Sequence, residues 1–96
     1  MEPRVRFNLP ELHALVAIAE RGSFRAAAEA LHVSQPALSR RIDKLEGALG
    51  ARLFERTTRR VRVTQRGQQL YDRVSPLFGA LREATITPTA SSEEPR

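Results

Sequence analysis

The chain has 96 residues, a length that suits one small domain. It carries 16 Lys and Arg against 11 Asp and Glu, a formal net charge of +5, so an anionic partner is expected. It contains no cysteine, which excludes a disulfide framework, a thiolate metal site and a cysteine nucleophile, and which fits a reducing, cytoplasmic compartment.

The positive charge is concentrated in one segment. Residues 40–66 hold nine cations and three anions, a net of +6, while the remaining residues sum to −1. A basic segment of this kind is typical of a nucleic-acid-binding face. Fifteen of the 16 cations are arginine, a side chain suited to phosphates and base edges, although a coding bias toward arginine explains that excess equally well.

The first expected element is a helix over residues 9–21, where apolar residues recur at helical spacing. Asn8 is the expected N-cap, Pro10 sits in the tolerated first turn, and Gly22 ends the helix. Glu11 and His13 interrupt the apolar run, so a signal peptide is rejected. No apolar stretch approaches the length that spans a membrane.

Two further helices follow, joined by a tight turn at His32. Ser23 is expected to cap the first and Ser34 the second, which ends at Gly50. Both helices have an apolar face that is expected to form the core, made of Phe24, Ala27, Ala28 and Leu31 in the first and Leu38, Ile42, Leu45 and Leu49 in the second. The opposite face of the second helix carries Pro36, Arg40 and Lys44, flanked by Ala37 and Arg41.

A short β-hairpin is expected next, over residues 52–63, with a tip rich in threonine and arginine. Arg59 and Arg60 at this tip are interpreted as DNA contacts, and protection of an edge strand is the alternative. Glu46 is expected in a structural ion pair, because phosphate would repel it.

A fourth helix is predicted over residues 65–84, capped by Thr64 and distorted at Pro76, and residues 85–96 read as a disordered tail. Its apolar stripe packs either on the chain's own first helix or on a second subunit, and the second interpretation is favoured. The residues assigned to this dimerisation stripe are Leu70, Val74, Leu77, Phe78 and Leu81.

The pattern as a whole is mainly α: a winged helix-turn-helix domain (1–64), with a three-helix core and a short hairpin wing, followed by a linker helix. The helix-turn-helix covers about residues 23–42. Because the N-terminus of such a second helix enters the DNA major groove, Gln35 is expected to read adenine, and Arg40 guanine or a phosphate. Ser34 and Ser39 suit bases or phosphates, and Pro36 and Ala37 suit a thymine methyl group.

The run from Gly22 to Gly67 resembles the N-terminal DNA-binding domain of LysR-type transcriptional regulators. The resemblance rests on residues at fixed spacing: Ser23, Phe24, Ala27, Ala28, Leu31, Ser34–Ser39, Ile42, Leu45, Glu46, Leu49, Gly50, Leu53, Phe54, Arg56, Thr64 and Gly67. It implies sequence-specific binding to double-stranded promoter or operator DNA in the bacterial nucleoid, at an interrupted palindrome, by a homodimer or, in a full-length form, a tetramer. The output is activation or repression of transcription.

By this resemblance, the N-terminus of the third helix faces the bases, and the wing lies in or beside the minor groove. The full set predicted to contact DNA is Ser23, Arg25, Ser34, Gln35, Pro36, Ala37, Ser39, Arg40, Arg41, Lys44, Arg56, Thr57, Arg59 and Arg60. Family members continue into an effector-binding domain, which is expected to be absent here together with any effector site. The chain is then either an excised domain or a naturally short protein.

Two other functions are alternatives at the level of the sequence. In an interaction module, the fourth helix would pair with a full-length relative and poison it. An enzyme acting on nucleic acid is rejected for want of a candidate acid, base or nucleophile, and His13 and His32 are too few for a metal site, so no cofactor is expected. The sequence leaves open the operator, the regulated genes, the inducer and the strength of dimerisation.

Overall fold

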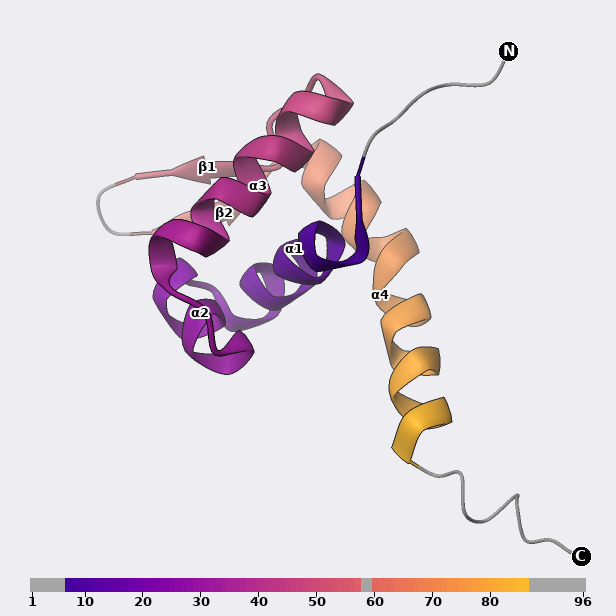
Figure 1. Ribbon diagram of the computed structural model, residues 1–96. Coiled ribbons are helices and arrows are strands. Elements are labelled where there is room, and N and C mark those ends of the chain that lie inside the picture. The colour runs from indigo at the N-terminus through magenta and orange to yellow at the C-terminus, as the bar shows by residue number, and fades with distance from the viewer. Residues whose placement is uncertain (1–6, 58–59, 87–96) are drawn as a thin grey trace, which may run out of the picture.

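A computed structural model describes residues 7–57 and 60–86. Its elements are α1 (Leu9–Arg21), α2 (Phe24–Leu31), α3 (Gln35–Leu49), β1 (Phe54–Arg56), β2 (Val61–Val63) and α4 (Gln65–Ile86). Figure 1 shows α1 in the middle, with α2 and α3 on one side and α4 on the other, and the β1–β2 hairpin projecting beside α3. This arrangement confirms the mainly helical, winged helix-turn-helix fold.

The first three helices begin where short polar side chains cap them, as predicted. Each cap oxygen accepts the amide three residues ahead: Asn8 from Glu11 at 2.9 Å, Ser23 from Ala26 at 2.9 Å, and Ser34 from Ala37 at 3.1 Å. These bonds satisfy amides that have no partner within the helix. The start of each helix is therefore set by its own sequence.

The turn between α2 and α3 is closed by a residue that is not glycine. His32 adopts φ 59° and ψ 43°, a left-handed conformation that side chains with a Cβ seldom take. Its amide donates to the carbonyl of Glu29, and the amide of Val33 donates to that of Ala28 at 3.0 Å. These bonds terminate α2 and send the chain directly into the Ser34 cap.

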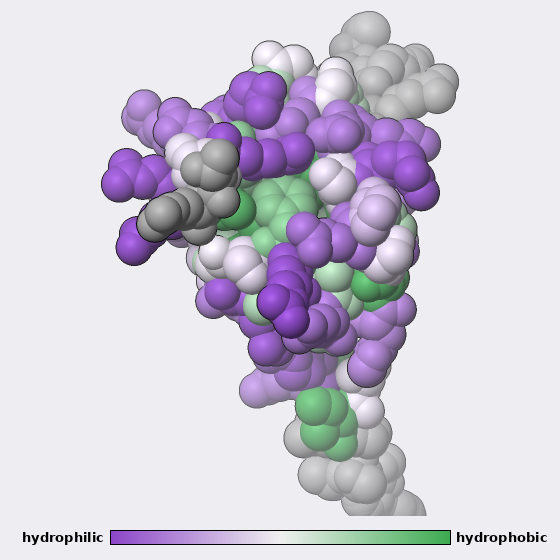
Figure 2. Space-filling view, turned by 90° about the vertical axis from the view of Figure 1, so that its left-hand side faces the viewer, coloured by the Kyte–Doolittle hydropathy of each residue, from purple (hydrophilic) through white to green (hydrophobic). Residues whose placement is uncertain are grey.

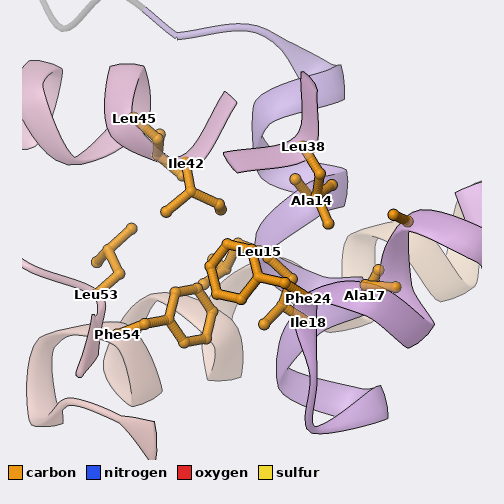
Figure 3. Close-up of a cluster of buried hydrophobic side chains, with 12 residues drawn as sticks. Ala14, Leu15, Ala17, Ile18, Phe24, Leu38, Ile42, Leu45, Leu53 and Phe54 are labelled. Carbon is orange, nitrogen blue, oxygen red and sulfur yellow. The ribbon is translucent and has the colours of Figure 1, made fainter. Parts of the chain in front are cut away.

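The core lies where α1, α2, α3 and the base of the wing meet. Figure 3 shows Phe24 and Phe54 side by side among aliphatic side chains from α1 and α3. Their rings meet edge to face, with centroids 6.0 Å apart. Leu38, Ile42 and Leu45 are fully buried, as the predicted apolar stripe requires, and Leu49 at the helix end is partly buried. The core thus fixes α3 with its other face outward.

The wing is joined rigidly to the start of α4. β1 and β2 pair antiparallel, with Phe54 opposite Val63. The hydroxyl of Thr64 donates to the carbonyl of Arg52 at 2.7 Å and accepts the amide of Gly67 at 3.0 Å. A Cβ at Gly67 would overlap the carbonyl oxygen of Leu53, so only glycine lets α4 approach the strand this closely.

The predicted apolar stripe of α4 divides into two parts. Leu70 is partly buried against the core and Val74 is 7% exposed, so both residues pack within the chain itself, and their place in a dimerisation face stays a prediction. The reason is that the first half of α4 lies along α1, where Tyr71 donates to Glu20 at 2.9 Å. Farther along, Leu77 and Leu81 remain 62% and 49% exposed.

The end of α4 differs from the prediction. The helix continues to Ile86, two residues past the expected boundary at residue 84, and it runs through Pro76. Residues 87–96, the rest of the predicted tail, lie outside the described part of the chain. Phe78 stacks on the His13 ring of α1 with centroids 4.9 Å apart, which leaves this side chain only partly exposed. Among the helices that the structure describes, none is both long and apolar enough to cross a membrane.

Candidate DNA-binding face

A recess with an apolar floor and a polar rim lies between the start of α2, the first half of α3 and the wing (Figure 2). Its volume is about 330 Å³. The lining residues are Gly22, Ser23, Phe24, Arg25, Gln35, Ser39, Arg56, Thr57, Arg60 and Val61. Figure 2 shows this face, where a green hollow is ringed by purple, hydrophilic side chains. The fold has therefore brought seven of the predicted DNA contacts to one concavity, from segments far apart in the sequence.

Arg56 links the wing to both helices of the helix-turn-helix. Its guanidinium carbon lies 4.7 Å from the centroid of the Phe24 ring. Its Nη2 atom lies 3.4 Å from Oδ1 of Asp43 and 4.0 Å from Oε1 of Glu46. A guanidinium over an aromatic face, between two carboxylates, is held by cation–π and charge attraction together. Arg56 thereby connects the wing to α2 and α3 and contributes positive charge to the recess.

Glu46 is the buried anion that anchors the base of the wing. It is 8% exposed, and its Oε2 atom accepts the amides of Leu53 at 2.8 Å and Phe54 at 3.3 Å. Its Oε1 atom lies 3.6 Å from Nε of Arg52. The predicted structural ion pair is confirmed, and the two backbone bonds add a role in positioning β1 that the sequence did not suggest.

Thr57 and Arg60, at the ends of the two strands of the wing, are joined by hydrogen bonds. The Thr57 hydroxyl accepts the Arg60 amide at 2.9 Å, and the Thr57 amide donates to the Arg60 carbonyl at 3.0 Å. These bonds hold both residues at the edge of the recess. Arg59, predicted to reach the minor groove, lies outside the described residues.

The start of α3 is open to solvent beside the recess. Ser34, Gln35, Pro36 and Arg40 are exposed, whereas Ala37 and Ser39 are half-buried. Gln35 and Ser39 line the recess itself. The amide, hydroxyl and guanidinium groups of this segment are thus available to a ligand that approaches the helix N-terminus.

Two predicted contacts, Arg41 and Lys44, line other hollows. Arg41 lines a separate hollow of about 560 Å³ with His13 and Phe78, and Lys44 lines another near the start of α1. Arg41 and Lys44 lie on the side of α3 that faces away from Ser39, because they follow it by two and five positions at about 100° per residue. Arg25 lines the recess but also pairs with Glu29 at 3.5 Å, both side chains being exposed.

Comparison with known proteins places the chain in a family. Residues 9–68 match the model of the bacterial regulatory helix-turn-helix proteins of the LysR family. This chain belongs to the LysR family. The matched segment of the LysR proteins covers all three core helices, the wing and the first turn of α4, so it contains the whole recess.

LysR relatives with curated descriptions share almost half of the aligned residues. The DNA-binding transcriptional dual regulator OxyR of Escherichia coli K12 is 45% identical over 87 residues, which are 91% of this chain and 28% of that protein. The regulator PtxR of Pseudomonas aeruginosa PAO1 is 47% identical over 74 residues, covering 77% of this chain and 24% of the relative. The chain therefore spans about a quarter of the length of these LysR regulators.

Solved LysR structures have the same fold. The BenM DNA-binding domain, in a complex with catB site 1 DNA, is 32% identical with a TM-score of 0.80, covering 94% of this chain and all of that chain. The oxidised form of Corynebacterium glutamicum OxyR is 34% identical with a TM-score of 0.82, covering 95% of this chain and 28% of that one.

Proposed function

We propose that this chain is the DNA-binding domain of a bacterial LysR-type transcription regulator. It binds double-stranded DNA with sequence specificity, as a homodimer on an interrupted palindrome, and so acts in the bacterial nucleoid. The observation that carries the proposal is the recess, which joins three arginines and three hydroxyl groups beside the exposed start of α3. The relatives are transcription regulators, and the BenM domain was solved bound to DNA.

The shape of this face suits the two grooves of duplex DNA. An α-helix entering the major groove by its N-terminus brings Gln35 and Arg40 to base edges. The wing, on the far side of the recess, then meets the adjacent minor groove. The phosphate backbone between the two grooves runs through the recess, where Ser23, Arg56 and Arg60 supply donors.

Dimer formation is supported by the second half of α4. Leu77 and Leu81 lie one helical turn apart and are 62% and 49% exposed, beside the partly exposed Phe78. Adjacent large apolar side chains on one helix face favour association. A dimer carries two copies of α3, and joining two half-site contacts raises the affinity for a palindrome through effective concentration.

The first test is a selection of preferred duplexes from a random pool at near-physiological salt. We expect an inverted repeat whose half-sites are about one helical turn apart. If the bound dimer contacts about six to ten phosphates, affinity should fall by about a thousand- to a hundred-thousand-fold between 50 and 200 mM salt. Enrichment of no sequence, with salt-independent binding, would contradict the proposal.

Replacement of Gln35 by alanine tests the assignment of a base reader. The affinity for the selected duplex should fall by about 1–3 kcal/mol, because the amide no longer bonds a base edge, while the affinity for random DNA should change little. Gln69→Ala, an exposed glutamine of α4 outside the recess, is the matched control. Equal losses on selected and random DNA would show that Gln35 does not read sequence.

The exposed stripe of α4 also favours the interaction-module alternative. In that case the chain pairs with a full-length LysR protein through Leu77, Phe78 and Leu81 in the absence of DNA. Co-expression with such a relative, followed by sedimentation without DNA, separates the two functions. A stable mixed species together with no selected duplex would favour the interaction module.

A further inference from the structure

Asp43 is an exposed anionic side chain that pairs with a cation lining the recess. Asp43 lies on α3 one turn after Ser39, so the two residues share a helix face. Its side chain is 61% exposed, and its Oδ1 atom lies 3.4 Å from Nη2 of Arg56. A carboxylate is thus placed beside the cation of the recess that links α2, α3 and the wing.

Arg56 has two other partners, and they differ from Asp43 in accessibility. The carboxylate of Glu46 is only 9% exposed and already accepts the amides of Leu53 and Phe54. The ring of Phe24 is buried in the core. Asp43 is the partner that solvent and a ligand can reach. Exposed ion pairs of this kind are weak and readily exchanged for another anion.

We propose that Asp43 competes with a DNA phosphate for Arg56 and thereby limits binding to non-specific DNA. The inference rests on the proposed DNA-binding function. Carboxylate and phosphodiester oxygens both accept hydrogen bonds from a guanidinium, so the two anions are alternatives at one position. On random DNA, where binding depends almost entirely on phosphates, this competition costs one contact. At a specific site, base contacts made by α3 offset that cost.

The test compares Asp43→Asn with Asp72→Asn on the full chain. Both changes remove one negative charge, but Asp72 lies on α4 outside the recess, where it accepts a bond from Gln68 at 2.8 Å. Binding to a random duplex is measured by fluorescence anisotropy between 50 and 200 mM salt. Freed Arg56 should make one more phosphate contact in each subunit, steepening the salt dependence by about 0.9 per subunit and raising affinity about five- to tenfold per subunit at 0.1 M salt.

Two further measurements use a variant that keeps the negative charge, Asp43→Glu, and the duplex selected from the random pool. Asp43→Glu should keep a wild-type salt dependence, and Asp43→Asn should gain less on the selected duplex than on random DNA. Thermal unfolding of the Asp43 variants checks that they keep the fold. We expect no change, because Arg56 retains its contacts with Glu46 and Phe24.

Three outcomes overturn the inference. Equal gains in Asp43→Asn and Asp72→Asn would mean that net charge alone matters. An unchanged salt dependence would mean that Arg56 gains no phosphate. A loss of affinity confined to the selected duplex would make Asp43 a base reader, because a carboxylate accepts from cytosine N4. Failure of the wild-type chain to bind any duplex would instead contradict the proposed function itself.

Discussion

The recess and the second half of α4 are both exposed surfaces, but only the recess consists largely of groups that water can hydrogen-bond. The recess is concave and rich in guanidinium, hydroxyl and amide groups, which water can hydrogen-bond until a ligand displaces it. Leu77, Leu81 and Ile86 of α4 are apolar and between 49% and 63% exposed, and water offers such groups no compensation. The recess can therefore remain open to solvent, whereas covering the apolar surface of α4 lowers the free energy of the protein.

This difference also separates how the two surfaces are built. The recess takes its shape from a buried charge and from contacts between distant segments, so changes behind it should alter its geometry. The second half of α4 extends away from the core (Figure 1), and changes there should leave the rest of the domain intact. Substitutions on each side can therefore be used to test the comparison.

The largest effect is expected on the recess side, from Glu46→Ala. The amides of Leu53 and Phe54 lose their acceptor, so the free energy of unfolding should fall by about 3 kcal/mol. Urea denaturation at fixed protein concentration measures this change. The control is Glu55→Ala, an exposed carboxylate of β1, which should alter stability by less than about 0.5 kcal/mol. Equal effects of the two changes would show that Glu46 does not anchor the wing.

A smaller effect is expected for Leu81→Glu, which places a charge in the proposed subunit interface. Each subunit loses a leucine that is 49% exposed before association, so self-association should weaken by about 2 kcal/mol in total, or roughly thirtyfold. Sedimentation equilibrium without DNA gives the dissociation constant. Gln69→Glu adds the same charge outside the stripe and should have little effect. An unaltered dimer in Leu81→Glu would place the interface elsewhere.

The smallest effects on stability are expected from two alanine substitutions, one in each half of α4. Val74→Ala should cost about 1–2 kcal/mol of stability, because Val74 is 7% exposed against the domain. Leu77→Ala should change the stability of the monomer by less than about 0.5 kcal/mol, because Leu77 is 62% exposed. Thermal unfolding of dilute samples distinguishes them. If Leu77→Ala proved the more destabilising, then Leu77, and not Val74, would be the residue that packs within the monomer.

Local features of the fold were predictable from the sequence, and contacts between distant segments were not. The caps at Asn8, Ser23 and Ser34 depend on residues three positions apart, so their pattern is visible in the sequence. By contrast, Arg56 meets Asp43 13 positions away, and Tyr71 meets Glu20 51 positions away. Such pairs exist only because the helices pack at particular angles.

The predicted site shows the same division. The start of α3 follows from its cap and its apolar stripe, which together turn Gln35 and Arg40 outward. The separation of Leu70 and Val74 from Leu77 and Leu81 could not be predicted, because all four share one helical spacing. Only the extent of α1, which covers the first pair, distinguishes them.

The close contact between Gly67 and the Leu53 carbonyl makes α4 a lever. With Thr64 bonded to Arg52 at its base, the 22-residue helix turns only together with the wing. At 1.5 Å per residue its far end lies about 33 Å from this pivot, so a tilt of about 5° at the base corresponds to a displacement of roughly 3 Å at the tip. The packing of two such helices against each other in a dimer therefore also sets the distance and the angle between their two wings.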